Sequence, residues 1–552
     1  MTAYRELAEA LEDVASTRGK LAKIARLAQT LSRVDEAELP AAARLLSGSP
    51  FAENEQAVTS VGWATVLRAA SAVTGWDEET IGACAGAVGD LGEAVALLLP
   101  REGLPGMTVA ETDLFFRDLS LRSKPAEKRA AVEAMLRRST AVEGKYLLKT
   151  LSGGLRIGAD VTTVEEAVAR AFGRDREAVA RARRDSGDIG ETAAAARSGR
   201  LGEIRFRLFH PIGFMLASPI EEAEEVAGEL PDFAVEDKFD GIRAHLHKDG
   251  GRVALFSRTL DDVTQQFPEI AGEAAGLEGS FLLDGEIVAW DPASPASAGD
   301  RGRPASFFRL QRRLGRKAPE EALLAEIPTA FIAYDCLARD DRPLFEEPWA
   351  ERRRQLEEIA KGQPLRLSDV FAAADPASLE ELFGRARARG NEGLVLKRRD
   401  STYQAGKRGR GWRKWKKALA TFDVVVTAVE QGHGKRAGML SDYTFAVRDE
   451  DRLVNIGKAY SGLTDEEIRT LGTQFRKLTT ARYGPVRAVK PEVVIEVSFD
   501  SLQKSTRHKS GFALRFPRIV RLRPDKSPAE VTTLQEVREL YERLSQGVPP
   551  TM

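Results

Sequence analysis

The sequence predicts a multidomain protein with an all-α region, a central α+β region and a C-terminal β-barrel region. Three observations support this. The chain has 552 residues, enough for three or four domains. Apolar residues recur at helical spacing early in the chain, and short strand-like runs replace them after Pro211. A second set of short strand-like runs begins near Phe422. We place the domains at residues 1–205, 206–418 and 419–552.

Residues 1–205 are predicted to form several short helices. Alanine is frequent and runs of β-branched residues are few, which favours helix over strand. Clusters of Gly and Pro indicate turns at Ser47–Pro50, Pro100–Gly106 and Leu151–Gly158. The apolar residues that fall on one helical face near the start are Leu7, Leu11, Val14, Leu21, Ile24, Leu27, Leu31 and Val34.

The central region mixes strand and helix patterns, as an α+β domain does. Ile242–His247 alternates apolar and polar residues, and a Gly-containing turn leads to a returning strand at Val253–Phe256. Asp291–Ala305 is rich in Pro, Ala, Ser and Gly and is predicted to be a surface loop. The other predicted strands are Phe281–Trp290, Ala330–Leu337 and Gly393–Lys397, and the predicted helices are Trp349–Ile359 and Ser378–Arg389.

The C-terminal region reads as short strands with a single helix, around Asp465–Arg476. About 130 residues of this pattern suit a small barrel, for which an OB-fold is the first expectation. The predicted strands are Val424–Val429, Tyr443–Val447, Leu453–Ile456 and Val493–Val497.

Composition excludes several classes of protein. Lys plus Arg total 82 and Asp plus Glu total 83, so a protein that is basic throughout is excluded, although basic residues can still cluster locally. Two cysteines, Cys84 and Cys336, and five histidines argue against a disulfide framework and a multi-Cys zinc site. Met1–Ser16 lacks the apolar core of a signal peptide, and the apolar run Ala94–Leu99 is too short to span a bilayer. We expect a cytoplasmic protein without a membrane partner.

The stretch Val235–Arg243 carries the most informative chemistry. A lysine between acids is usually a surface ion pair of little energetic value. Side chains alternate along a strand, so Glu236 and Lys238 share one face. Arg243 follows closely, and a nearby cation is expected to lower the pKa of Lys238 and make its neutral amine a nucleophile.

Charged or aromatic residues also end or interrupt the later strands. Arg258 follows a strand, and Glu286 lies within an apolar run, where a charge is costly unless it is paired or bound to metal. Tyr334 could stack on a flat base or be an ordinary core aromatic. Glu286 and Glu392 supply hard oxygen ligands suited to Mg²⁺ beside phosphates.

Two stretches concentrate positive charge. Residues 407–417 include seven basic residues and no acid, with two tryptophans interleaved. Such a run is most often a solvated face or a non-specific nucleic-acid patch. Strand alternation, however, places Lys414 and Lys416 on one face, where they could bracket a phosphoryl group. Residues 504–526 contain eight Lys or Arg and one acid, and include Arg515 and Arg518, whose guanidinium groups match phosphate oxygens.

In order and spacing these stretches resemble the ATP-dependent DNA ligases, a branch of the covalent nucleotidyltransferases. The matching segments are Lys238-Phe239-Asp240-Gly241 with Arg243, Phe256-Ser257-Arg258, Asp284-Gly285-Glu286, Tyr334-Asp335, Glu392–Lys397, Trp412–Lys416, and Arg515–Arg518 with Asp525-Lys526. The resemblance covers nearly the whole chain, because Tyr146–Gly158 resembles the DNA-binding domain of the archaeal and eukaryotic replicative ligases. Gly432–Gly438 resembles the start of their OB domain. Where the family usually has Phe, this chain has Tyr334.

The resemblance implies a role for each matching residue. Lys238 would attack the α-phosphate of ATP and carry AMP, which then moves to the 5′-phosphate of a nick before the 3′-hydroxyl displaces it. Glu236 would accept a hydrogen bond from adenine, Tyr334 would stack on the base, and Arg243 and Glu286 would hold the ribose. The residues expected to neutralise phosphates are Arg258, Arg408, Lys414, Lys416, Arg515 and Arg518, and those expected to hold Mg²⁺ are Glu286 and Glu392.

The implied partner is nicked double-stranded DNA, with ATP and Mg²⁺ as cofactors and the protein acting as a monomer. Residues 1–205 would bind DNA, 206–418 would perform adenylation and 419–552 would form the OB domain. An RNA ligase or capping-type nucleotidyltransferase shares the Lys-x-Asp-Gly pattern, but the long helical region argues against it. A ligase-like DNA-binding protein without activity is a further alternative, although no expected catalytic position is missing. The sequence does not separate replication from repair.

Overall fold

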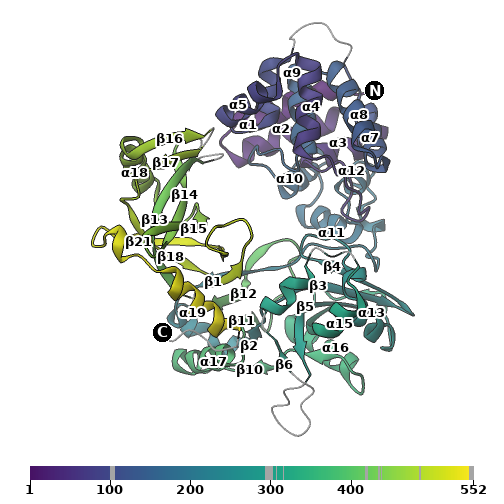
Figure 1. Cartoon of the computed structure of the whole chain (residues 1–552). Helices are drawn as coiled ribbons and strands as arrows, with labels where there is room; N and C mark the ends of the chain where they lie inside the picture. The colour runs from purple at the N-terminus through teal and green to yellow at the C-terminus, as the bar shows by residue number, and fades with distance from the viewer. Residues whose placement is uncertain are drawn as a thin grey trace. The chain divides into compact units, whose positions relative to one another are not determined.

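The computed structural model divides the chain into two compact units, Met1–Ile212 and Gly213–Met552, each of which is described by itself. Figure 1 labels the elements within each unit. The structure describes all residues except 100–105, 293–302, 306, 315, 317, 417–419, 433–435, 437, 484, 485 and 546–552. Most of the predicted loop at Asp291–Ala305, part of Gly432–Gly438 and Lys417 therefore lie outside the described residues.

The first unit is helical throughout its regular elements, as the sequence predicts. Side chains cap several helix starts: Thr108 and Thr140 each accept a hydrogen bond from the backbone of a glutamate three residues on, whose carboxylate bonds back. The α-helices are α1 (Tyr4–Ser16), α2 (Lys20–Arg33), α3 (Leu39–Ser47), α4 (Trp63–Thr74), α5 (Glu78–Val88), α6 (Leu91–Leu98), α7 (Val109–Leu121), α8 (Pro125–Arg137), α9 (Ala141–Leu151), α10 (Val161–Ala171), α11 (Arg176–Ser186) and α12 (Ile189–Ser198).

One hydrophobic core joins these helices. The apolar face predicted near the start of the chain supplies Leu7, Leu11, Leu27 and Leu31, all fully buried or nearly so. Leu21 is the exception, because 76% of its surface remains exposed. The helical periodicity therefore identified the buried face correctly except at the first turn of α2.

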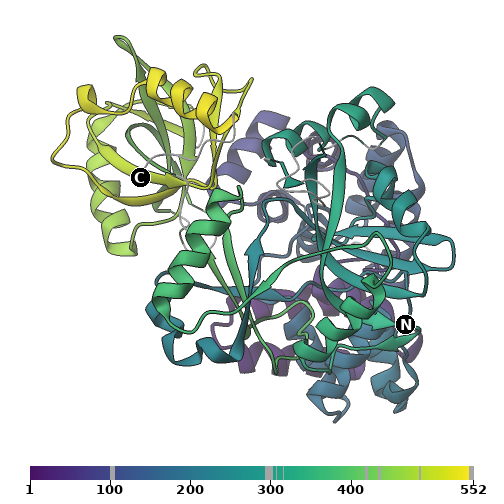
Figure 2. The ribbon, with the colours of Figure 1, turned by 90° about the horizontal axis from the view of Figure 1, so that it is seen from below.

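The second unit begins with two sheets that share the α+β region (Figures 1 and 2). One sheet has the strand order β1-β12-β11-β2-β10, and the other has the order β4-β3-β5-β7-β8, with β6 on β5 and β9 on β7. The strands are β1 (Leu216–Ile220), β2 (Phe233–Lys238), β3 (Ile242–Asp249), β4 (Arg252–Ser257), β5 (Phe281–Asp291), β6 (Arg303–Pro304), β7 (Thr329–Arg339), β8 (Arg342–Pro343), β9 (Arg366–Leu367), β10 (Val370–Phe371), β11 (Gly393–Arg398) and β12 (Arg408–Lys416).

Helices cover these two sheets and complete their cores. Phe383 of α17 packs with Leu394 and Trp415 beneath the first sheet, and Leu356 of α16 packs with Leu283 and Ile287 beneath the second. The helices are α13 (Pro268–Ala275), α14 (Phe307–Leu310), α15 (Glu321–Glu326), α16 (Trp349–Ala360) and α17 (Pro376–Ala388). The predicted strands and helices of this region are confirmed within a few residues.

The C-terminal part of this unit is rich in strands. β13 pairs on one side with β14 and on the other with β17 and β18, and β18 also pairs with β21. The elements are β13 (Ala420–Gln431), β14 (Leu440–Asp449), β15 (Arg452–Ala459), α18 (Asp465–Leu478), β16 (Thr479–Tyr483), β17 (Val486–Val489), β18 (Val494–Phe499), β19 (Ser501–Lys504), β20 (Phe512–Arg515), β21 (Arg518–Leu522) and α19 (Leu534–Ser545). The expectation of a single helix is wrong, because α19 packs Leu534 and Val537 into the same core.

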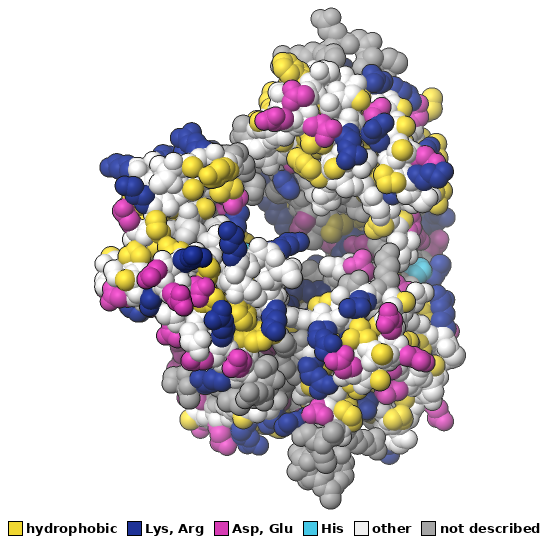
Figure 3. Space-filling model, viewed as in Figure 1, with side chains coloured by type: hydrophobic (Ala, Val, Ile, Leu, Met, Phe, Trp, Pro, Cys, Tyr) yellow, Lys and Arg dark blue, Asp and Glu magenta, His cyan; other side chains and the backbone are white. Residues whose placement is uncertain are grey.

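The surface carries both signs of charge. On the face drawn in Figure 3, Lys and Arg side chains intermix with Asp and Glu, as the near-zero net charge predicts. Among the described residues no single helix is long and apolar enough to cross a membrane; one sharply bent pair, Glu78–Gly86 with Leu91–Leu98, meets the length and composition criteria together.

Candidate active site

The site is built on two antiparallel strands of the first sheet, β2 and β11. Their register places Gly393 opposite Lys238 and Val395 opposite Glu236. The Glu392 N–H donates to the Lys238 carbonyl oxygen at 2.8 Å, which brings the Glu392 side chain beside Lys238. Gly393 adopts φ +152°, and a Cβ there would overlap the Trp415 carbonyl oxygen, so only glycine fits this close approach.

Lys238 lies among carboxylates. Its ammonium group forms an ion pair with Glu392, and about a quarter of each side chain is exposed. Burial lowers the pKa of Lys238, but the negative charges of Glu392, Glu286 and Asp240 outweigh burial and raise that pKa above its ordinary value. The expectation that Arg243 lowers this pKa is wrong, because the carboxylates are the dominant charges around the amine.

The acids around Lys238 are held in a crowded, buried position. Burial raises the pKa of Glu286 to about 8, and Glu392 and Asp284 add to this effect while Lys238 and Arg243 oppose it. Burial also raises the pKa of Asp240 to about 7. Three carboxyl groups close to one amine repel one another, so a cation or a positively charged ligand group would be stabilised between them.

The other side chain on this face of β2, Glu236, is 2% exposed. Its Oε2 atom accepts hydrogen bonds from Ser368 Oγ at 3.0 Å and from Lys397 Nζ at 2.9 Å. Its Oε1 atom is buried and has no hydrogen-bond partner in the described structure. A buried acceptor without a partner is costly, so it marks a place where a ligand donor would bind.

Aromatic rings line the space beside Glu236. Tyr334 on β7 and Trp412 on β12 meet edge to face, with ring centroids 6.4 Å apart. Lys397 Nζ lies 4.3 Å from the Tyr334 ring centroid and 4.5 Å from that of Trp412. The Arg243 guanidinium lies 5.8 Å and 5.4 Å from the same two rings. Two aromatic rings and two cations therefore lie together beside the unpaired Glu236 oxygen, and aromatic rings can pack against a flat base.

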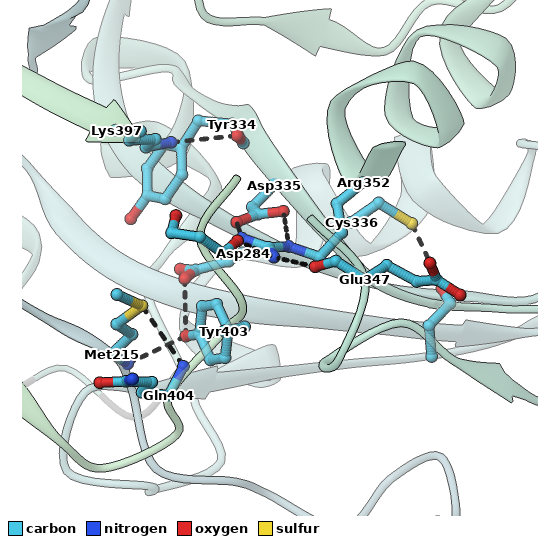
Figure 4. Close-up of polar contacts among 12 residues, drawn as sticks. Met215, Asp284, Tyr334, Asp335, Cys336, Glu347, Arg352, Lys397, Tyr403 and Gln404 are labelled. Atoms are coloured by element: carbon cyan, nitrogen blue, oxygen red, sulfur yellow. Dashed lines mark hydrogen bonds and ion pairs between the residues drawn. The ribbon is translucent and has the colours of Figure 1, made fainter. Parts of the chain in front are cut away.

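Arg243 is fixed from behind by a buried polar network. Asp284 accepts two hydrogen bonds from Arg243, at 2.6 and 3.0 Å. It accepts a third from the Tyr403 hydroxyl at 2.8 Å, which Figure 4 shows. The Met215 carbonyl oxygen accepts another from Arg243 at 2.6 Å. Burial raises the pKa of Asp284, but Arg243 and His245 outweigh burial and hold it well below its usual range. Asp284 is therefore an anchor for Arg243.

A second buried ion pair lies next to this network. Arg352 donates two hydrogen bonds of 2.8 Å to Asp335, and neither side chain is exposed (Figure 4). Arg352 also donates to the carbonyl oxygens of Glu347 and Ser401, at 2.7 and 2.9 Å. Asp335 thus ties β7, which carries Tyr334, to α16 and to the loop before β12.

The basic residues of β12 lie on the neighbouring strand. Lys414 and Lys416 both belong to β12, so the strand on which their shared face was predicted is present, and Lys416 forms an ion pair with Asp500. Burial lowers the pKa of Lys414, and the positive charges of Lys238, Lys416 and Arg408 lower it further. Arg408 is exposed and donates to the Ala217 carbonyl oxygen at 2.7 Å.

Of the remaining predicted residues, Arg515 lies near the site, whereas Arg258 and Arg518 do not contact it. Arg515 ends β20 and lies with its guanidinium carbon 4.6 Å from the Phe307 ring centroid, and its charge lowers the pKa of Asp240, an effect that burial outweighs. Arg258 and Arg518 are exposed and form no side-chain ion pair or hydrogen bond with any other described residue. The structure therefore gathers Glu236, Lys238, Arg243, Glu286, Tyr334, Glu392 and Lys414 in one region and leaves Arg258 and Arg518 outside its contacts.

Sequence reasoning missed several residues that support this site. Lys397 follows the apolar run Leu394-Val395-Leu396 near the end of a strand. A charged residue at that position could have indicated a buried ion pair. Ser368 and Tyr403 lie in loop segments with no pattern around them, so no signal pointed to either. Among the described residues no group of three or more His, Cys, Asp or Glu side chains is arranged to hold a metal ion by itself.

A strand-end lysine beside carboxylates, on the same strand as a buried glutamate with an unpaired oxygen, is the arrangement expected of a covalent nucleotidyltransferase. Three family models match the chain: the DNA ligase N terminus over residues 3–169, the ATP-dependent DNA ligase domain over 214–416, and the ATP-dependent DNA ligase C-terminal region over 436–526. The chain belongs to the family of ATP-dependent DNA ligases.

Relatives match over almost the whole length. A probable DNA ligase of Koribacter versatilis is 43% identical, over 97% of this chain and 96% of its own. A DNA ligase of Methanoculleus marisnigri is 34% identical over 99% of both chains. The solved structure described as Pmar-Lig_PreS3 covers 94% of this chain and 99% of its own, with a TM-score of 0.61 at 15% identity, and supports the fold alone.

Proposed function

We propose that this chain seals nicks in duplex DNA in three steps. The Lys238 amine attacks the α-phosphorus of ATP, forms a phosphoramidate with AMP and releases pyrophosphate. The AMP then passes to the 5′-phosphate at the nick, and the 3′-hydroxyl attacks that phosphorus and expels AMP. The observation that carries the proposal is the position of Lys238, which forms an ion pair with Glu392. Lys238 shares its strand with Glu236, whose buried Oε1 atom has no hydrogen-bond partner among the described residues.

The base pocket suits adenine. Glu236 Oε1 would accept from the 6-amino group, because it is buried and has no other donor among the described residues. Tyr334 and Trp412 supply aromatic surface, and Arg243, which Asp284 holds in place, would contact the ribose together with Glu286. Most of the pocket is thus formed before the nucleotide arrives, which reduces the entropy cost of ordering it.

Phosphoryl transfer depends mainly on positioning and on neutralising charge. Lys414, Lys416, Arg408 and Arg258 are proposed to contact the phosphates, and Arg515 and Arg518 to engage them from the C-terminal region. Glu286 and Glu392 would hold Mg²⁺; two carboxylates are enough, because Mg²⁺ keeps water and phosphate oxygens as its other ligands. When bound there, the ion would supply positive charge to the phosphate oxygens and to the crowded carboxylates.

Lys238 must lose its proton before it attacks. The carboxylates that raise its pKa favour the protonated form, so any ligand that neutralises Glu392 or Glu286 favours the nucleophilic amine. Neighbouring Lys414 adds positive charge from the other side. The same carboxylates therefore orient the amine before the reaction and release it when their charge is neutralised.

The other two regions are proposed to serve DNA. The helical unit would bind the duplex through sequence-independent phosphate contacts. The C-terminal region is proposed to be an OB-fold: β13 is shared by both halves of the sheet, and α18 lies between its third and fourth main strands. The domain boundaries at residues 205/206 and 418/419, action as a monomer and a cytoplasmic location remain predictions.

The test uses full-length protein with ATP labelled at the α-phosphate, followed by a denaturing gel, and a nicked duplex with ATP or NAD. We expect an AMP adduct that survives denaturation and alkali but is lost in acid, as a phosphoramidate is, and sealing with ATP but not with NAD. A protein that forms no adduct, or that seals only an RNA nick, would contradict the proposal. Sealing of RNA alone would favour the RNA ligase alternative.

A further inference from the structure

Glu236 accepts hydrogen bonds on one oxygen only, and its two donors come from separate segments of the chain. Lys397 on β11 and Ser368, in the loop between β9 and β10, both donate to Oε2. Ser368 is itself held by Arg353 of α16, which donates to the Ser368 hydroxyl at 3.1 Å and to its carbonyl oxygen at 2.9 Å. Oε1 is left as the free acceptor.

Two hydrogen-bond acceptors fix the orientation of the Lys397 ammonium group. One N–H donates to Glu236 Oε2 at 2.9 Å. Another donates to the Tyr334 carbonyl oxygen at 3.1 Å, as Figure 4 shows. The ammonium group also lies against the faces of Tyr334 and Trp412. Only 1% of the Lys397 side chain and 2% of the Glu236 side chain are exposed, so water does not compete for either charge.

The protonation state of Glu236 decides which base it can bind. An ionised carboxylate only accepts hydrogen bonds, whereas a protonated carboxyl can donate one. Adenine offers a 6-amino donor, and hypoxanthine and guanine offer a 6-oxo acceptor at the same place. Two acceptors facing each other in a buried site leave both unpaired, which is costly. An ionised Glu236 therefore favours the 6-amino base, and a protonated one favours the 6-oxo base.

We propose that Lys397 and Ser368 are positioning residues that keep the Glu236 carboxylate ionised and its Oε1 atom free, so that the pocket selects a 6-amino purine over a 6-oxo purine. This inference rests on the proposed function of Glu236 and assigns a role in nucleotide selection to two residues that do not themselves touch the base. Ser368 sets the orientation of the carboxylate, and Lys397 sets both its orientation and its charge.

Burial prevails at Glu236 and raises its pKa, so the ionised form depends on the groups that oppose burial. Burial raises the pKa of Glu236, and the charges of Lys397 and Arg353 and the Ser368 hydrogen bond oppose that effect. Burial lowers the pKa of Lys397, and Glu236 and Asp335 oppose it. Removing Lys397 therefore takes away the largest effect that keeps Glu236 ionised. The charged or titratable groups facing this pair are Arg353 on α16, Asp284 on β5, Tyr334 and Asp335 on β7, and Arg243 on β3.

The experiment measures labelled lysyl-nucleotide formation with ATP and with ITP, in single turnovers from pH 5.5 to 9, using full-length wild type, Lys397→Met, Lys397→Arg and Ser368→Ala. ITP has the 6-oxo group without the 2-amino group of GTP, so it isolates the contact in question. Lys248→Met is the matched control, because Lys248 is also buried, bonds two carbonyl oxygens and lies over Phe281, but faces no carboxylate of the pocket.

For wild type we expect a preference for ATP of roughly 100-fold or more that holds at neutral and alkaline pH. In Lys397→Met the preference falls by at least roughly tenfold, and ITP use rises as the pH falls, because Glu236 then takes up a proton. Lys397→Arg keeps the charge and restores most of the preference. Ser368→Ala raises KM for ATP by roughly tenfold with little change in kcat, because it loosens the bound base rather than the chemistry.

Two results would overturn the inference while leaving the proposed function intact. One is an active Lys397→Met protein with the wild-type ATP preference at every pH, and the other is an equal loss of preference in Lys248→Met. If Lys397→Met does not fold, Ser368→Ala and Lys397→Arg decide, and an unchanged KM for ATP in Ser368→Ala contradicts the role of Ser368. A wild type that forms no adduct with either nucleotide contradicts the proposed function and this inference with it.

Discussion

Two lysine–glutamate ion pairs join β2 to β11 or to the residue just before it, Glu392, yet they are built differently. Lys238 and Glu392 are each about one-quarter exposed, whereas Lys397 and Glu236 are almost completely buried. The pKa of Lys238 is raised and that of Lys397 is lowered, because Lys238 has three carboxylates around it and burial dominates at Lys397. The number of counter-charges and the access of water therefore distinguish Lys238, the proposed nucleophile, from Lys397, the proposed positioning residue.

The glutamates of the two pairs differ in the same way. Burial raises the pKa of both, but at Glu392 the positive charges of Lys238 and Lys416 outweigh it and the pKa is lowered. At Glu236 burial prevails and the pKa is raised. Glu392 and Lys238 are partly exposed, so a metal ion can replace Lys238 beside Glu392 and a phosphate can replace Glu392 beside Lys238. Glu236 and Lys397 are buried, so they either stay paired or become neutral by proton transfer.

The largest effect is expected from removing the reactive lysine. Lys238→Ala should abolish adduct formation and the sealing of ordinary nicks, because no other amine occupies its position. Lys238→Arg should fail as well, since a guanidinium stays protonated near neutral pH. Sealing of a nick that already carries 5′-AMP should persist in Lys238→Ala. Gel analysis of both substrates measures this, and an AMP adduct on the Lys238→Ala protein would refute the assignment.

The two glutamates should differ in their effect on stability. Glu236→Gln leaves Lys397 buried without its carboxylate and is expected to cost about 3–5 kcal/mol. Glu392→Gln should cost about 1 kcal/mol or less, because Lys238 keeps solvent and the carboxylates of Glu286 and Asp240. Urea unfolding of the full-length variants measures both changes.

A double variant controls this comparison. Glu236→Gln with Lys397→Met removes both buried charges and should recover much of the loss, as expected when a whole buried pair is replaced. Equal losses from Glu236→Gln and Glu392→Gln, or an additive loss in the double variant, would show that burial does not distinguish the two pairs.

A substitution at Arg518 tests whether adduct formation at Lys238 depends on the C-terminal region. If Arg518 closes over the nucleotide, Arg518→Ala should slow adduct formation by roughly 100-fold, as the loss of one phosphate-neutralising group does. Sealing of a pre-adenylated nick should fall by only about threefold, because that step involves no pyrophosphate. Rates of both reactions on one protein preparation provide the comparison. Equal decreases would instead indicate a role in DNA binding or folding.

The smallest effect is expected from removing the hydroxyl group of Tyr334. Tyr334→Phe keeps the ring, and the Tyr334 hydroxyl forms no side-chain hydrogen bond to another described residue. The rate of adduct formation should therefore change by about threefold or less. Tyr334→Leu is the control that removes the ring and should raise KM for ATP clearly. An equal loss in the two variants would mean that the hydroxyl, and not the ring, has the functional role.

Local patterns were sufficient for much of this molecule. Alternation predicted β3 and β4, helical spacing predicted the buried face of α1 and α2, and the ordered motifs identified Lys238, Glu286 and Glu392 as candidates. The second C-terminal helix, α19, was missed although Val537 and Leu540 carry its buried face. Arg258 and Arg518 match their motifs, but no described contact joins them to the pocket.

The sequence by itself determined the family, the order of the regions and the candidate nucleophile, because each depends on residue type and on spacing along the chain. Only the tertiary structure decided which oxygen of Glu236 is free and in which direction the pKa of Lys238 moves. Both depend on segments far apart in sequence: Ser368 and Lys397 meet Glu236, and Glu286 and Glu392 meet Lys238. Electrostatic energy follows distance and burial in space, and neither can be read from the order of residues.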